Sequence, residues 1–160
     1  MGKDRPQDEE TPKERADREL IELLNELRVV LPGVTVLLAF LLAVPFANGW
    51  TRVTAFQRDV FVVAFLSTAV AVALLTAPSS YHRLRFRQGN KERMVRMGNR
   101  LAIAGIAASA VSLEAVVLLV IDSVLSRGVA IAAAAALFAI VALLWYGLPL
   151  LGALRDRSAR

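Results

Sequence analysis

The stretch PSSYHRLRFRQGNKERMVRMGNR, residues 78–100, is a basic segment between two long apolar runs. It holds seven Lys and Arg residues against a single acid, Glu92. The flanking runs, 60–77 and 101–121, each approach the roughly 20 residues that a helix needs to cross a bilayer core of about 30 Å. Segregation of charge explains how the chain is 56% hydrophobic and still 21% charged. The sequence therefore predicts a multi-pass membrane protein.

Two further apolar runs complete the predicted fold. Together they give four membrane helices, at about residues 29–47, 60–77, 101–121 and 129–151. Before the first, leucines recur every three or four residues from Leu20 to Leu31, which predicts an amphipathic helix from residue 15. Arg18 and Glu22 form an i,i+4 pair on it. The expected fold class is all-α: an integral membrane four-helix bundle preceded by an amphipathic cytoplasmic helix.

The ends of the chain and three prolines refine this picture. Residues 1–14 are polar and are expected to form a disordered cytoplasmic tail, and residues 152–160 a basic cytoplasmic tail. Pro32 lacks the N–H that would bond to the Arg28 carbonyl, so a kink or break is expected at Pro32-Gly33. Pro45 should act similarly near the end of the first span, and Pro78 should close the second.

The distribution of Lys and Arg predicts the orientation. The basic segment and the C-terminal tail carry ten of these residues, whereas the two opposite links carry three, namely Arg52, Arg58 and Arg127. Because cytoplasmic loops are enriched in Lys and Arg, both termini are expected in the cytoplasm of a cell-membrane protein.

Glu114 is the one carboxyl group within an apolar run. Charged groups at mid-bilayer are costly, about 2.5–3.5 kcal/mol on the insertion scale, and usually face a bundle interior or a water path. One interpretation is a proton or cation site. The other is a structural carboxyl group, hydrogen-bonded to a neighbouring helix or able to reach water at the outer interface.

A face of small residues lies nearly opposite Glu114 on the same helix, formed by Gly105, Ser109 and Ser112. Small residues allow helices to approach closely. The third span is therefore expected to touch partners on two sides, either as the central helix of the bundle or as the interface of a homo-oligomer, with ordinary close packing favoured.

The basic segment has three compatible interpretations. It can set orientation, bind anionic lipid head groups, or contact the acidic N-terminal helix. Arg93, Arg96 and Arg100 share one helical face and form a candidate basic surface for lipid or helix binding. Nucleic-acid binding is not expected, since no recognition motif is present.

Several site classes are not expected. The chain has no Cys and one His, which argues against disulfides and a zinc site. No nucleotide-binding, metalloprotease or hydrolase motif occurs. We therefore expect no enzyme activity, no metal and no cofactor.

Some stretches resemble a family of small four-pass bacterial membrane proteins of unknown function, mostly from high-GC Gram-positive bacteria and sometimes labelled sodium:proton antiporters. They are ELLNELRVVLPG (residues 22–33), Val44-Pro45-Phe46, Gln57-Arg58, Ala77-Pro78 and His82-Arg83. The resemblance covers roughly residues 20–150 and implies fold and membrane location. It directs attention to polar residues that could form a cytoplasmic mouth: Glu22, Asn25, Glu26, Arg28, His82 and Arg83.

Two functional hypotheses follow. The first is a small ion- or proton-coupled transporter or channel subunit that uses Glu114. The second is a membrane-anchored scaffold that binds anionic lipid or a protein partner through its cytoplasmic face. A homo-oligomer is expected in either case, because four short spans bury little protein surface.

Overall fold

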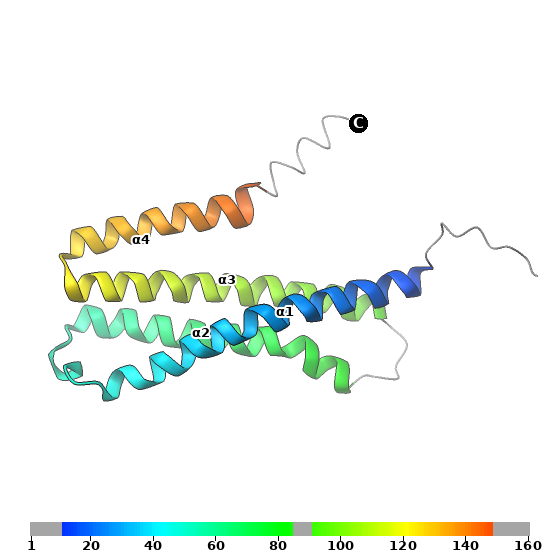
Figure 1. Ribbon diagram of the computed structural model, residues 1–160, viewed down its shortest axis with the longest axis horizontal. Helices are drawn as coiled ribbons and strands as arrows, with labels where there is room; N and C mark the ends of the chain where they lie inside the picture. The colour runs from blue at the N-terminus through cyan, green and yellow to red at the C-terminus, as the bar shows by residue number, and fades with distance from the viewer. Residues whose placement is uncertain (1–10, 85–90, 149–160) are drawn as a thin grey trace, which may run out of the picture.

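The computed structural model describes residues 11–84 and 91–148, and these residues form helices joined by short turns, with no strand among them (Figure 1). The helices are α1 (Pro12–Ala43), α2 (Ala55–Leu84), α3 (Lys91–Val124) and α4 (Arg127–Ala142). Two 3-10 turns, Val44–Phe46 and Trp50–Arg52, link α1 to α2, and a π-helical turn, Leu143–Gly147, follows α4.

Each helix is long and apolar enough to cross a membrane. The stretches concerned are Asp17–Phe46, Ala55–Ser80, Arg93–Val124 and Arg127–Trp145. Many large apolar side chains on their surfaces are exposed, as expected for residues that face lipid. The predicted all-α membrane fold is confirmed.

Helix α1 begins earlier and runs further without interruption than the sequence suggested. Thr11 caps it through a reciprocal pair of hydrogen bonds with Glu14, so residues 12–14 are helical and not part of a disordered tail. Residues 1–10 lie outside the description. The amphipathic helix and the first span are one helix of 32 residues.

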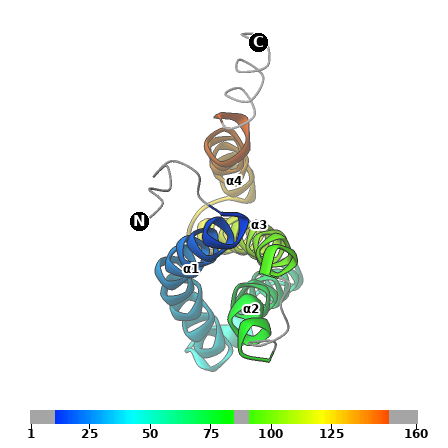
Figure 2. The ribbon, with the colours of Figure 1, turned by 90° about the vertical axis from the view of Figure 1, so that its right-hand side faces the viewer.

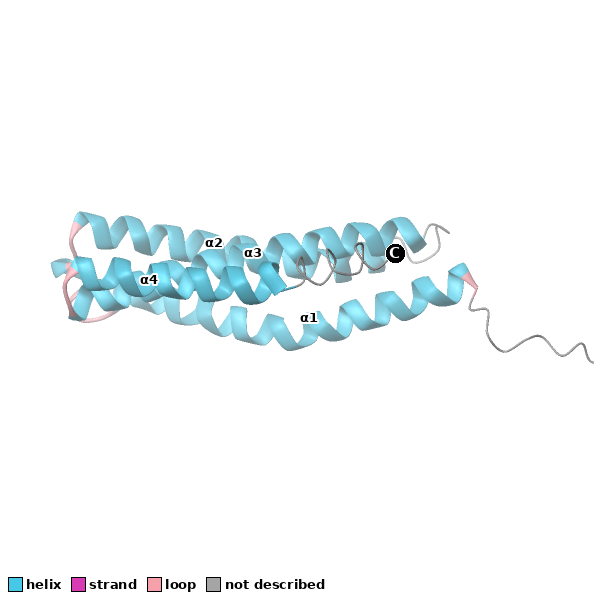
Figure 3. Cartoon of the chain, turned by 90° about the horizontal axis from the view of Figure 1, so that it is seen from above, coloured by secondary structure: helices cyan, strands magenta, loops and turns pink. Residues whose placement is uncertain are grey.

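Of the kink or break expected at Pro32, the break is not found, because α1 continues through Pro32 as one helix, which bends near its middle (Figure 3). The Thr35 hydroxyl donates to the carbonyls of Leu31 and Pro32, at 2.9 and 3.0 Å, beside the interrupted hydrogen-bond ladder. Pro45 lies in the 3-10 turn that follows the helix. Pro78 does not close α2, which continues to Leu84. Membrane helices tolerate such prolines where neighbouring groups compensate.

Helix α3 lies at the centre of the helix bundle. It packs against α1, α2 and α4 (Figure 2), whereas α4 packs along α3 and meets α2 at its first residue, where Arg127 lies against Phe56. The expectation that the third span touches partners on two sides is confirmed, and α4 is left with most of its surface exposed.

The small-residue face of α3 packs against α2 within the same chain. A Cβ atom at Gly105 would lie 2.7 Å from Leu75 Cγ, so the helices approach closely there. About two turns along α3 from Gly105, Ser112 lies against Thr68 of α2. Both residues are fully buried and their hydroxyls are hydrogen-bonded to each other. Both hydroxyl oxygens also lie within hydrogen-bond distance of the Ala64 carbonyl oxygen, at 2.7 and 3.0 Å, so one hydroxyl donates to its partner and the partner donates to this carbonyl. Around Gly105 and Ser112 this face is therefore occupied by α2 of the same chain.

The Thr68–Ser112 contact predicts a measurable coupling between α2 and α3. In a double-mutant cycle of Thr68→Val and Ser112→Ala, unfolding in detergent should give a coupling free energy of about 0.6 kcal/mol and at most about 1.7 kcal/mol. As a control, Ser67→Ala should show no coupling to Ser112→Ala, because Ser67 bonds to carbonyls of its own helix. Additive effects of Thr68→Val and Ser112→Ala would contradict the contact.

The helices extend beyond the apolar spans at the end where α1 begins. At about 1.5 Å per residue, the 32, 30 and 34 residues of α1, α2 and α3 are each longer than a bilayer core of about 30 Å. In this extension Leu20, Leu23 and Leu27 are buried, and the Leu23 side chain lies against Gly98 of α3. The leucine-lined face of α1 therefore holds it beside α3, where the basic residues lie.

Candidate functional site

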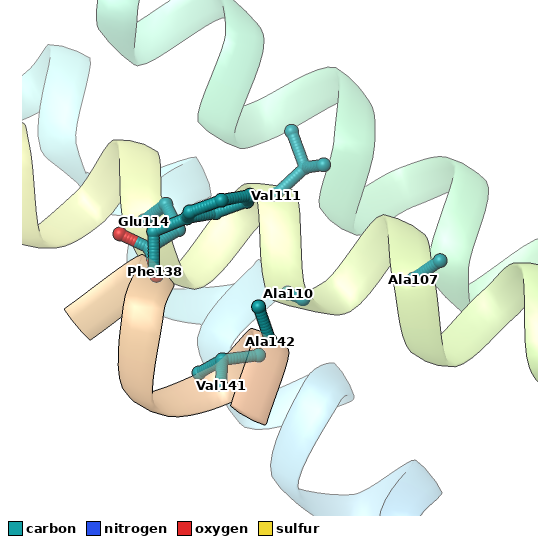
Figure 4. Close-up of a pocket in the computed structure, with 7 residues that line it drawn as sticks. All are labelled: Ala107, Ala110, Val111, Glu114, Phe138, Val141 and Ala142. Atoms are coloured by element: carbon teal, nitrogen blue, oxygen red, sulfur yellow. The ribbon is translucent and has the colours of Figure 1, made fainter. Parts of the chain in front are cut away.

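Glu114 lies in a pocket between α3 and α4 with a volume of about 350 Å³ (Figure 4). Helix α3 contributes one side of the pocket and α4 the other. Apart from Glu114, every lining residue is apolar: Ala107, Ala110 and Val111 from α3, and Phe138, Val141 and Ala142 from α4. The small side chains of the alanines leave the space between the two helices unfilled.

The carboxyl group of Glu114 has no protein partner in the described part of the chain. Both oxygens are buried and neither makes a hydrogen bond there. The expectation of a carboxyl group hydrogen-bonded to a neighbouring helix is therefore not met among these residues. A buried polar group without a partner costs free energy, so an unsatisfied carboxyl group calls for an explanation.

Glu114 is separated from the other buried polar groups. Ser112, two residues earlier, faces α2, and Glu114 faces α4 on the other side of α3. Successive residues in a helix are about 100° apart, since a turn takes about 3.6 residues. Within residues 11–84 and 91–148, the Thr68–Ser112 pair and Glu114 therefore do not form one continuous polar path.

A second polar cluster joins three helices at the end opposite the basic segment. Gln57 Nε2 of α2 donates to Asp122 Oδ2 of α3 at 2.9 Å, and Arg127 Nε of α4 lies 3.2 Å from Asp122 Oδ1. The Arg127 guanidinium also lies 4.0 Å from the ring centroid of Phe56. These contacts fix the turn between α3 and α4, and so position α4 beside Glu114.

The sequence did not predict this cluster. The resemblance pointed to Gln57, but its partner Asp122 is 65 residues away along the chain. The one local signal was the pair of opposite charges, Asp122 and Arg127, on either side of a short turn.

The residues expected to form a cytoplasmic mouth do not line the pocket. Glu22, Asn25, Glu26 and Arg28 are exposed on α1, and Arg18 Nη1 lies 3.2 Å from Glu22 Oε1, which confirms that i,i+4 pair. His82 and Arg83 belong to the last turn of α2, but their side chains lie outside the description. The mouth stays a prediction.

The candidate basic surface lies on the part of α3 that precedes its apolar span. Arg93, Arg96 and Arg100 are exposed there, and the helix begins at Lys91. Much of the remaining basic segment, and the tail from residue 149, fall outside the described residues. In the parts that are described, no three His, Cys, Asp or Glu side chains are grouped as metal ligands.

Comparison with known proteins places the chain in a family. A family profile covers residues 9–149, and the family is one of unknown function. The expected membership of such a family is thereby confirmed. No curated protein and no solved structure matches the chain.

Proposed function

The chain belongs to DUF6328, a family of unknown function, and we propose that it is a small membrane transport protein in which Glu114 carries a proton or a cation. The observation that supports this most is the buried Glu114 carboxyl group, which lies in a pocket and has no hydrogen-bond partner among residues 11–84 and 91–148. Ionisable residues within membrane spans usually mark ion or proton sites.

The proposed orientation places both termini in the cytoplasm of the cell. Arg93, Arg96 and Arg100 lie at the end where α1 begins, and the less basic turns lie at the opposite end. The positive-inside rule favours this arrangement. A homo-oligomer is part of the proposal, since α4 packs along α3 and leaves most of its own surface exposed.

Flux measurements test the transport proposal. Purified protein in liposomes would be exposed to proton, sodium and potassium gradients in turn, with a pH-sensitive dye inside. Transport requires flux above that of protein-free liposomes under at least one gradient. Absence of flux under all three, with protein shown to be folded, would reject transport of these ions.

A second candidate function is a membrane-anchored scaffold that acts through its cytoplasmic face. The exposed arginines on the extension of α3 favour it, because basic clusters next to a membrane helix attract anionic head groups by about 1 kcal/mol per residue. In this case the spans would serve as an anchor and Glu114 would have no role.

This second candidate predicts lipid-dependent stability. Added phosphatidylglycerol should raise the melting temperature of the detergent-purified protein more than phosphatidylcholine does, and replacement of Arg93, Arg96 and Arg100 by Glu should remove the difference. The control is Arg52→Glu with Arg58→Glu at the opposite end, which should retain it. An equal loss in both variants would indicate a general charge effect and not a lipid site.

A further inference from the structure

We propose that the pocket between α3 and α4 binds a monovalent organic cation with an apolar body, whose charge pairs with the Glu114 carboxylate. This inference rests on the proposed role of Glu114 and specifies its substrate class. Four features support it: the size of the pocket, its lining residues, its opening toward lipid, and the charges of the ligand and of Glu114.

The size and lining favour an apolar molecule over a metal ion. The volume of about 350 Å³ falls within the range of small-molecule pockets, about 300–1,000 Å³. Metal cations such as Ca²⁺ and Mg²⁺ require about six or more oxygen ligands. Glu114 is the one lining residue with a polar side chain, so the lining cannot supply such a shell. A proton and an organic cation need no such shell.

Phe138 supplies a second group suited to a cation. It comes from α4 and lines the same pocket as Glu114 (Figure 4). An aromatic face attracts an organic ammonium group by about 0.5–1 kcal/mol, and more where water is excluded. The carboxylate and the ring together select positive charge on an otherwise apolar body.

The pocket is accessible from the lipid side of the helices. Two of its lining residues, Val111 and Phe138, are 51% and 64% exposed, and α4 covers one side of α3 only. Since the other six lining residues are apolar, the pocket suits a ligand that partitions into the membrane. This matches an amphiphilic cation and not a hydrated ion.

Charge balance couples the ligand to a proton. Removal from water disfavours an isolated carboxylate, so an empty pocket favours the protonated acid. When the cation enters, the acid releases its proton through the same opening and the carboxylate pairs with the cation. The net charge in the pocket is therefore zero both before and after binding. One proton leaves for each cation that binds.

No other charged side chain faces this exchange within the described helices. The other six lining residues are apolar. Neither α2 between Asp59 and Pro78 nor α1 after Arg28 has a charged residue. On α3 and α4 the nearest charged side chains are Asp122 and Arg127, which contact each other at the end of the helices. Proton release can therefore be assigned to Glu114.

Binding of benzyltrimethylammonium to the full-length protein in detergent tests the proposal. Calorimetry would give the affinity, and a pH dye in weak buffer would give the protons released. Neopentylbenzene, in which carbon replaces the charged nitrogen, is the neutral control. Glu114→Gln removes the charge, and Ala110→Leu fills the pocket. Ala104→Leu, at an exposed site on α3 outside the pocket lining, is its matched control.

The expected result is binding with release of up to one proton, weakened at least about tenfold by Glu114→Gln and by Ala110→Leu and unchanged by Ala104→Leu. Phe138→Leu should weaken binding about two- to fivefold. Equal binding to wild type and Glu114→Gln, or of the neutral analogue, would overturn the proposal. Proton flux that depends on Glu114 without cation binding would also overturn it, while leaving the proposed function intact.

Discussion

Glu114→Gln is expected to reduce proton flux in liposomes to the level of protein-free vesicles. Glutamine has nearly the same size and shape as a protonated glutamic acid, but it cannot release or bind a proton. The pocket walls would be unchanged, because six of the seven lining residues are untouched. An isosteric change of this kind should alter the free energy of unfolding by about 1.5 kcal/mol or less.

Wild-type protein and Glu114→Gln must both be folded and must be present at the same protein-to-lipid ratio in the liposomes. Thermal unfolding in detergent checks the fold, and Glu114→Asp gives a variant that retains a carboxyl group one methylene shorter. We expect Glu114→Asp to keep measurable flux. If Glu114→Gln transported protons at the wild-type rate, Glu114 would have no part in transport, and attention would shift to the cytoplasmic face.

Gly105→Leu is expected to have the largest effect on stability. The first added atom, Cβ, would lie 2.7 Å from Leu75 Cγ and 3.3 Å from Leu74 Cβ, and Leu75 is fully buried in the core. The remaining atoms of the leucine would force α2 and α3 apart and disrupt the nearby Thr68–Ser112 contact. We expect a loss of about 3 kcal/mol or more, measured by unfolding in detergent.

Gly33→Leu is the matched control, because it makes the same replacement in the interior of another helix. A Cβ at Gly33 would meet no atom within 4 Å, and leucine has the better helix propensity by somewhat under about 1 kcal/mol. Gly33→Leu should therefore be neutral or stabilising. Similar losses at both sites would show that α2 and α3 do not approach closely at Gly105.

The sequence was sufficient to predict four helices long and apolar enough to cross a membrane, and to predict that α3 has neighbours on two sides. Its apolar runs match the four helices, and the separation of Gly105 and Ser112 from Glu114 on the helical wheel matches their contacts with α2 and α4. Both inferences rest on local properties, namely hydropathy and helical periodicity.

The boundaries of the helices could not be predicted from hydropathy. Apolar runs mark the part of a helix that faces lipid, but α1 and α3 continue into polar residues that face water. Proline was also a poor guide, because α1 and α2 pass through Pro32 and Pro78. In both cases hydrogen bonds and packing from neighbouring residues decide whether the helix continues.

The pocket depends on contacts between distant residues. Glu114 was identified as a single carboxyl group, but the space around it exists because Ala107 and Ala110 face Val141 and Ala142 of another helix. The position of α4 in turn depends on the contacts of Asp122 with Gln57 and Arg127. The periodic pattern of one helix predicts which of its faces is buried, but it does not predict which residues of another helix pack against that face.

Chemical modification by dicyclohexylcarbodiimide tests most directly whether Glu114 is a protonatable carboxyl group in a pocket open to lipid. This neutral, lipid-soluble reagent adds to protonated carboxylic acids, and the stable N-acylurea product can be assigned by peptide mass spectrometry. We predict modification of Glu114, reduced by Ala110→Leu, and no modification there by a water-soluble carbodiimide. Modification confined to exposed acids such as Glu22 and Glu26, with Glu114 untouched, would contradict this account.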